Sequence, residues 1–295
     1  MVEYTEDIWQ VGGEFMLDKI YLEITNVCNL DCTFCHKTVR AKKLMSAEEF
    51  EVLIDKLAGK AKYLYFHLMG EPTLHPLLPS FIKTARDKGF LPMVTTNGSL
   101  LREKGDALLS ALPYKISISL HAPEANSDFS TDGYWESCVT FAKEASARGC
   151  IVALRLWNLG SGADNSEILQ FLHTSFPGEW GKVRGGSSLR LADKLFLEWG
   201  ERFDWPDPAL PECAPDEDVF CYGLRDQIGI LVDGTVVPCC LDADANLALG
   251  NLFNAGLEEI LASPRAKAIY DGFTHRRAVE PLCRKCGYAK RFSRG

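Results

Sequence analysis

Short apolar runs rich in β-branched residues alternate with amphipathic segments from about residue 19 to residue 200. This rhythm is typical of repeated strand–helix units. Ser46 and Glu49 form a capping-box signature that opens the first helix, and Gly59, Gly89 and Gly149 mark helix ends. Strands are expected at residues 20–24, 63–68, 91–95, 115–120, 151–157 and near 194–198, with helices between them that include 46–59, 102–112 and 166–176.

Six consecutive units predict a parallel sheet in an α/β fold. The sheet is either open and doubly wound or curved into a partial (β/α)6 barrel, and periodicity alone does not separate the two. In both, functional residues sit at the C-terminal ends of the strands and in the loops that follow.

The rhythm breaks at residues 202–219, where prolines and acidic residues predict a linker. We therefore expect an N-terminal extension at 1–18, the strand–helix domain at 19–201 and a small domain at 220–295. In the small domain, Asp233 and Gly234 predict a hairpin, and two short helices are expected near 257–261 and 264–273. So short a piece buries little apolar surface, and a metal cluster would explain how it holds its shape.

Composition narrows the function classes. A hydrophobic content of 46% supports a large core, and the net charge of -8 makes a nucleic-acid substrate unlikely. No apolar run is long enough to span a membrane and the N-terminus lacks a signal pattern, so we expect a cytoplasmic protein with no membrane partner. Eleven cysteines in that compartment should be reduced, which makes their spacing informative.

Three cysteines, Cys28, Cys32 and Cys35, directly follow the first predicted strand. Thiolates are the usual ligands of iron–sulfur clusters, and three on one loop can wrap a single cubane while leaving one iron open. The alternatives are three reduced thiols and a zinc site that lacks its fourth ligand. Neither alternative explains why the triplet sits at the C-terminal end of a strand that opens a βα series.

This spacing and placement resemble the radical S-adenosylmethionine (SAM) superfamily. The resemblance implies a partial (β/α)6 barrel with a 4Fe–4S cluster whose open iron chelates the methionine end of SAM. It further implies reductive cleavage of SAM to a 5′-deoxyadenosyl radical, with an electron donor such as flavodoxin or ferredoxin. Phe34 occupies the aromatic position of the family that contacts the adenine.

Four further residues match SAM-binding positions. Gly70 and Glu71 resemble the second and third residues of the Gly-Gly-Glu-Pro motif that receives the SAM amino group, although Met69 replaces its first glycine. Ser119 resembles the residue that contacts the ribose. Arg155 is the one charge in an apolar run and would suit the SAM carboxylate, or it could pair with a nearby acid as part of the structure.

A second cysteine set lies in the small domain: Cys221, Cys239, Cys283 and Cys286. A hairpin between two ligands followed by a late Cys-x-x-Cys can hold either a zinc ion or a cubane. The pattern is similar to the shortened SPASM domain, called a twitch domain. That resemblance implies one auxiliary 4Fe–4S cluster, two clusters in all, with electron relay as its role. Cys240 is the alternative to Cys239.

Other polar residues lie near predicted strand ends and could meet a substrate: His67, Asn97, His121, Asn158 and Glu198. Any one of them could instead be structural. A compact chain favours a small-molecule substrate in a lyase, dehydrogenase or related enzyme, and residues 65–72 look similar to queuine lyase-like proteins, which implies queuine conversion to 7-aminomethyl-7-deazaguanine. The alternatives are a peptide- or protein-modifying enzyme and a non-catalytic scaffold with zinc in both sites.

The two cysteine sets lead to a prediction about iron content. Anaerobic reconstitution should give about eight irons per chain, from two cubanes. Replacing Cys28, Cys32 and Cys35 together by Ala should leave about four irons and abolish 5′-deoxyadenosine formation. Retained 5′-deoxyadenosine in the triple variant would end the radical SAM interpretation.

Overall fold

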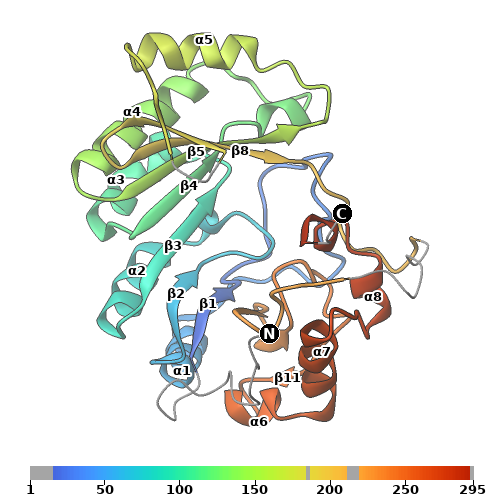
Figure 1. Ribbon diagram of the computed structural model, residues 1–295. Coiled ribbons are helices and arrows are strands. Elements are labelled where there is room, and N and C mark those ends of the chain that lie inside the picture. Colours follow the sequence, from blue (N-terminus) through green and yellow to red (C-terminus); the bar gives the residue numbers. More distant parts are fainter. Residues whose placement is uncertain (1–15, 184–186, 211–218, 293–295) are drawn as a thin grey trace.

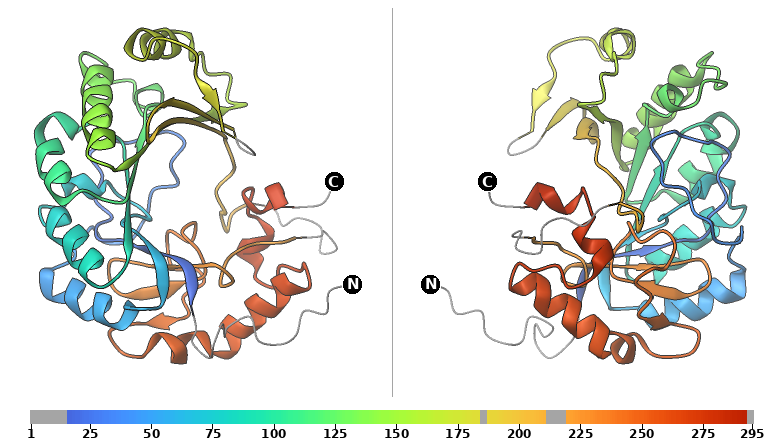
Figure 2. Two further views of the ribbon diagram at one scale, coloured as in Figure 1. Left: turned by 60° about the vertical axis from the view of Figure 1, so that its left-hand side comes forward. Right: turned by 90° about the vertical axis from the view of Figure 1, so that its right-hand side faces the viewer.

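The computed structural model describes residues 16–183, 187–210 and 219–292. Six strands run parallel in the order of the chain: β1 (Leu17–Leu22), β2 (Ala61–Tyr65), β3 (Leu91–Thr96), β4 (Lys115–Ser119), β5 (Ile151–Leu159) and β8 (Leu195–Glu201). The sheet curves, with the helices that connect its strands along the outer side (Figures 1 and 2). This confirms the α/β fold and its parallel strands.

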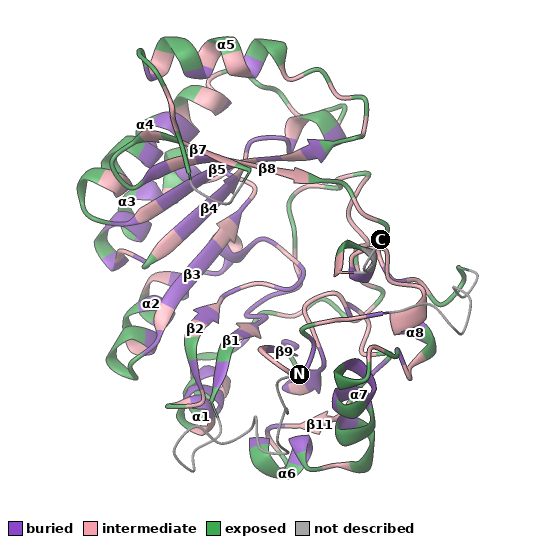
Figure 3. Ribbon diagram, viewed as in Figure 1, coloured by how far each residue is buried: buried purple, intermediate pink, exposed green. Residues whose placement is uncertain are grey.

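The connecting helices lie close to their expected positions: α1 (Ala47–Leu57), α2 (Leu78–Asp87), α3 (Leu101–Ala111), α4 (Tyr134–Ala147) and α5 (Ser166–Ser175). Short 3₁₀ turns follow β2 (η1, Pro72–Leu74) and β4 (η2, Pro123–Ala125), and a third, η3, spans Ala289–Phe292. The capping box at α1 forms as predicted, since the Ser46 hydroxyl accepts from Glu49 N and the Glu49 carboxylate accepts from Ser46 N. The sides of these helices that face the sheet are buried and their outer sides exposed (Figure 3).

Two short strands that the sequence did not predict lie between α5 and β8. They are β6 (Gly181–Lys182) and β7 (Ser188–Ala192), and they extend the sheet as antiparallel strands beside β8. Their exposed or half-buried side chains carry little of the hydrophobic signal on which strand prediction depends.

The C-terminal segment adds β9 (Gln227–Ile230), β10 (Thr235–Val237), β11 (Gly250–Asn251), α6 (Leu257–Leu261), α7 (Pro264–Thr274) and α8 (Pro281–Arg284). The hairpin of β9 and β10 and the helices α6 and α7 were predicted from the sequence. Gly234 adopts φ +83°, and a Cβ there would lie 2.5 Å from the Phe253 ring, so the turn requires glycine.

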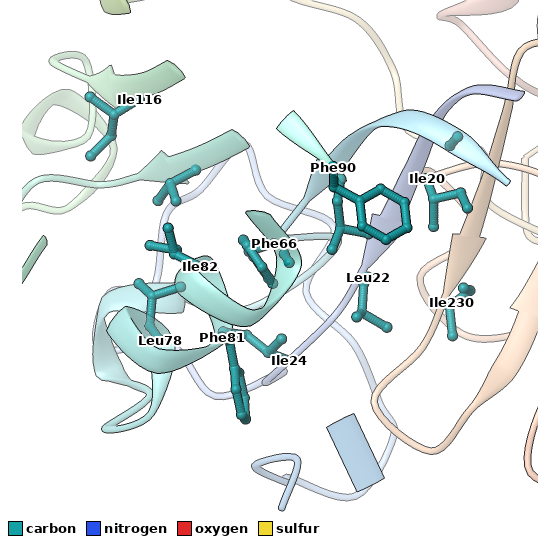
Figure 4. Close-up of a cluster of buried hydrophobic side chains, with 14 of the residues drawn as sticks. Ile20, Leu22, Ile24, Phe66, Leu78, Phe81, Ile82, Phe90, Ile116 and Ile230 are labelled. Carbon is teal, nitrogen blue, oxygen red and sulfur yellow. The ribbon is translucent and has the colours of Figure 1, made fainter. Parts of the chain in front are cut away.

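The expectation of a poor core in this segment is wrong, because β9 pairs in parallel with β1 and so joins the barrel sheet. Ile230 of β9 packs in the same buried cluster as Ile20 and Leu22 of β1 and Phe81 of α2 (Figure 4). The segment therefore shares the barrel's core rather than building its own. Among the described helices, none combines the length and apolar character needed to cross a bilayer.

The aromatic part of this core yields a stability prediction. Phe50 of α1 is fully buried and stacks on Phe81 of α2, with ring centroids 3.9 Å apart. Phe50→Ala should lower the free energy of unfolding by about 3–5 kcal/mol, because it leaves a cavity. Val52→Ala, on the exposed side of the same helix, should change it by about 0.5 kcal/mol or less. Urea unfolding of both variants is the measurement, and equal midpoints would contradict this view of the core.

Candidate functional site

A cavity of about 790 Å³ opens at the carboxyl ends of the parallel strands. Its wall includes all seven cysteines of the two predicted ligand sets, together with residues of β1, β2, β4, β5 and β8. The fold therefore brings two cysteine sets, far apart in the sequence, to the wall of one cavity. That volume lies within the usual range of small-molecule pockets.

The first set, Cys28, Cys32 and Cys35, lies on the loop between β1 and α1. Asn126 Nδ2 donates to Cys32 Sγ at 3.1 Å and Lys37 N donates to Cys35 Sγ at 3.4 Å. Such donors stabilise thiolates bound to iron. Desolvation raises the pKa of Cys28 to about 11, so this thiol is protonated without metal and would release its proton on binding one.

Gly70 and Glu71 hold the loop that carries these cysteines. Gly70 has φ +77°, and a Cβ there would lie 2.5 Å from the carbonyl oxygen of Thr25. Glu71 N donates to Val27 O at 2.8 Å, directly before Cys28. The close approach of the two loops explains why position 70 is glycine.

The Glu71 carboxylate is buried and accepts four hydrogen bonds from the protein. Its Oε1 accepts from Thr73 N (3.0 Å), Thr73 Oγ1 (2.6 Å) and Thr96 Oγ1 (2.8 Å), while Oε2 accepts from Asn97 N at 2.7 Å. A carboxylate has about four acceptor positions, two per oxygen, so Oε2 alone keeps room for another donor. Glu71 therefore positions the loops after β2 and β3, and a direct bond to the SAM ammonium is restricted to Oε2.

The remaining SAM candidates lie on two sides of the cavity. Phe34 packs near His121, with ring centroids 5.2 Å apart, and its carbonyl accepts from Trp205 Nε1 at 3.0 Å. Ser119 ends β4 opposite Arg155 of β5. The Arg155 guanidinium stacks 3.6 Å from the Trp157 ring centroid. Its other neighbours, described below, lie deeper in the barrel.

The second set, Cys221, Cys239, Cys283 and Cys286, also gathers in space. Burial raises the pKa of Cys239 well above the usual value, and the neighbouring sulfurs of Cys221, Cys240, Cys286 and Cys283 raise it further. Gly223 N donates to Cys221 Sγ at 3.4 Å. The alternative ligand, Cys240, instead packs beside Tyr21 in a separate small apolar cluster. These contacts favour Cys239 over Cys240.

No group of three His, Cys, Asp or Glu side chains among the described residues is arranged to hold a single metal ion. The thiols and the N–H groups directed at their sulfurs fit an iron–sulfur cluster in ligand type and number at both sites. Cys213, to which the sequence assigns no role, lies outside the described residues.

Four of the five predicted substrate residues line the cavity: His67, Asn97, His121 and Glu198. Asn158 does not. It is buried, and its amide bonds Glu124 at 2.6 Å and Asn165 at 2.9 Å. We therefore remove Asn158 from the substrate site, because its polar atoms serve the packing of neighbouring loops.

Sequence reasoning missed a set of contacts that clamps the cysteine loop onto the C-terminal segment. Asp244, which follows the second hairpin strand, accepts from Thr38 Oγ1 (2.6 Å) and Val39 N (3.0 Å), and it pairs with His36 Nε2 at 3.0 Å. Burial opposes its charge, but these hydrogen bonds outweigh burial and lower the pKa of Asp244. Arg40 Nε donates to Ala243 O at 2.7 Å. No local signal marks such long-range partners.

Comparisons with known proteins agree with this arrangement. The family model of the radical SAM superfamily matches residues 22–173, and that of SPASM, an iron–sulfur cluster-binding domain, matches residues 221–287. Fe-coproporphyrin III synthase of Methanosarcina barkeri is 30% identical over 151 residues, which cover 48% of this chain and 38% of that protein. GTP 3′,8-cyclase 1 of Mycobacterium tuberculosis is 27% identical over 314 residues, covering 95% of this chain and 84% of that protein.

Among solved structures, Streptococcus suis SuiB bound to its precursor peptide SuiA is similar, with a TM-score of 0.61 and 15% identity. The match covers 93% of this chain and 70% of that one, and at this identity it shows the fold alone. The chain spans only 25–38% of the length of the first three curated relatives that it matches.

The clamp at Asp244 gives a testable prediction. Asp244→Ala removes three contacts to the loop of the first cysteine set, so iron at that site should pass to a chelator about tenfold faster, the effect of losing one hydrogen bond to a charged group. Asp233→Ala is the matched control, because Asp233 lies in the same hairpin, is exposed, and its side chain accepts a local hydrogen bond from Thr235 N. Chelator-release kinetics of the reconstituted variants decide it, and equal rates in both would contradict the clamp.

Proposed function

The chain belongs to the radical SAM superfamily, and from that premise we propose that it is an enzyme acting on a small molecule held in the cavity between its two cysteine sets. It carries a SPASM-type cluster-binding domain in addition. Its cofactors are accordingly SAM and 4Fe–4S clusters, and it takes electrons from a donor. Flavodoxin or ferredoxin is the donor we propose.

When bound, the cluster and SAM supply reductive cleavage of the sulfonium to a 5′-deoxyadenosyl radical that removes a hydrogen atom from the substrate. Cys28, Cys32 and Cys35 would hold this cluster. Phe34 would contact the adenine, Gly70 and Glu71 would orient the amino group, and Ser119 would contact the ribose. The surrounding walls exclude water from the reacting atoms.

Cys221, Cys239, Cys283 and Cys286 would hold the auxiliary cluster. Four thiolates leave no iron open to a substrate, so relay of electrons is the role that fits this ligand set. Iron analysis separates this proposal from the zinc scaffold, which would contain zinc and no sulfide.

The volume of the cavity, about 790 Å³, is the observation that carries the small-molecule proposal. Aromatic side chains of β1, β2 and β5 (Tyr21, Tyr65 and Trp157) line the cavity, and the rings of Tyr21 and Tyr65 lie 4.8 Å apart. Queuine is a candidate from the resemblance at residues 65–72 alone. The similar proteins include a GTP 3′,8-cyclase and SuiB bound to its precursor peptide. Peptides are therefore tested as the second class of substrate.

The test is SAM cleavage by the reconstituted enzyme with dithionite, with and without candidate substrates. We expect 5′-deoxyadenosine at a basal rate and stimulation by a small molecule. Stimulation by peptides alone would make the enzyme a peptide modifier. Absence of any 5′-deoxyadenosine from protein with full iron content would overturn the proposal.

The role of Glu71 provides a separate prediction. Glu71→Gln replaces a carboxylate oxygen, which accepts hydrogen bonds, by an amide NH2, which donates, among four protein groups that also donate. The SAM binding free energy should therefore weaken by about 1.5–3 kcal/mol, while the iron content stays unchanged. Equilibrium SAM binding measures this. Unchanged affinity would show that the motif match assigns Glu71 no part in SAM binding.

A further inference from the structure

The inner end of the cavity holds an unbalanced set of charged and phenolic side chains. By strand alternation, alternate residues of each strand face the barrel interior. Those of interest here are Lys115 of β4, Arg155 of β5, Glu198 of β8, Tyr21 of β1, and Tyr65 and His67 at and after the end of β2, all of which line the cavity.

Two cations share one carboxylate in this group. Lys115 Nζ lies 2.7 Å from Glu198 Oε1, a direct ion pair, whereas Arg155 Nε lies 3.8 Å from Glu198 Oε2, beyond hydrogen-bond distance. Arg155 Nε is buried and has no hydrogen-bond partner among the described residues. Glu198 is therefore hydrogen-bonded to Lys115. The two cations share one negative charge, so the Lys115, Arg155 and Glu198 side chains together carry one excess positive charge.

Among the described residues, none of the neighbours of Arg155 accepts a hydrogen bond from its Nε, although the phenol oxygens and the neutral imidazole of His67 have acceptor positions. Burial raises the pKa of Tyr65 to about 12 and that of Tyr21 well above its usual value, so both phenols keep their protons. The Tyr21 hydroxyl is hydrogen-bonded to Cys240, so Tyr65 is the phenol placed to donate to a ligand. Burial and the Arg155 charge lower the pKa of His67 to about 3, so this imidazole is neutral, and its Nδ1 is also without a partner. Stacking on the Trp157 ring offsets part of the free-energy cost of burying the guanidinium. The ring does not accept a hydrogen bond in the plane of the guanidinium.

A buried N–H without a hydrogen-bond partner is costly, and a planar guanidinium matches an oxyanion through parallel hydrogen bonds. We propose that Arg155 and Lys115, with the phenol of Tyr65, form a subsite for an oxyanion, a carboxylate or phosphate, carried by the substrate, which speaks against queuine. The proposal rests on the proposed function, since it specifies the substrate of that cavity. It replaces the expectation that Arg155 binds the SAM carboxylate, because the ionisable groups that act on this guanidinium, Glu198, Tyr21, Tyr65 and Tyr288, belong to the strands and the C-terminal segment rather than to the cysteine loop.

The experiment uses the reconstituted enzyme with SAM bound and measures binding by calorimetry. The probes are benzoate, phenyl phosphate and the uncharged benzyl alcohol, with queuine as a base that has neither oxyanion. We expect at least one anionic probe to bind more tightly than benzyl alcohol and queuine, and the stronger of the two identifies carboxylate or phosphate as the preferred group.

Arg155→Gln should weaken the anionic probe roughly tenfold to a hundredfold. Lys83→Gln, which removes an exposed cation on the outer side of α2, should not. Glu198→Gln provides a gain that misfolding cannot mimic: without the competing carboxylate, the anionic probe should bind more tightly, by about tenfold.

SAM affinity is measured in parallel, so that failure of the subsite and failure of the proposed function are distinguishable. Unchanged SAM binding in Arg155→Gln, with loss of the anionic probe, supports the subsite. Loss of SAM binding with no change in the probe would return Arg155 to the SAM carboxylate. Equal affinity for charged and uncharged probes, or no gain in Glu198→Gln, overturns the proposal, while absence of SAM binding in the wild type would refute the proposed function itself.

Discussion

The buried Glu23 carboxylate at the end of β1 is the interaction on which the rest of the site depends. It is fully buried, and Arg40 Nη2 lies 2.7 Å and 2.8 Å from its two oxygens. It also accepts from Met69 N at 3.1 Å and from Val232 N at 3.2 Å. One carboxylate thus joins the cysteine loop, the loop after β2 and the hairpin of the C-terminal segment. Removing either partner of such a buried pair is costly because the other charge is left unpaired.

The remaining geometry follows from this junction. Met69 precedes Gly70, whose lack of a Cβ lets the loop after β2 lie against the strand that leads to Cys28. Val232 lies in the turn between β9, the strand that pairs with β1, and β10, and this hairpin leads on to Cys239 and Asp244. The two cysteine sets therefore face one cavity because the segments that carry them are hydrogen-bonded to the same carboxylate, that of Glu23. Loading one site with metal should restrict the loops that form the other.

Much of this arrangement was readable from the chain because its signals are local. Period-2 and period-3.6 patterns located the six parallel strands and their helices, and cysteine spacing located both ligand sets. Pairing of β9 with β1, and of Asp244 with Thr38, joins residues about two hundred positions apart, for which a single sequence has no signal. The alternation of side chains along β5 was a signal that the sequence analysis did not use. Arg155 and Trp157 share the face toward the barrel interior, so Asn158 lies on the opposite face. Lys115 is likewise a polar residue on the inner side of an apolar strand.

The central claim is that two iron–sulfur clusters face a single cavity. The most direct measurement is anomalous diffraction at the iron and zinc absorption edges from anaerobic crystals of the reconstituted protein. The account predicts two iron sites on the walls of one cavity, bonded by Cys28, Cys32 and Cys35 on one side and by Cys221, Cys239, Cys283 and Cys286 on the other. Zinc at the second site, or a single iron site, would contradict it.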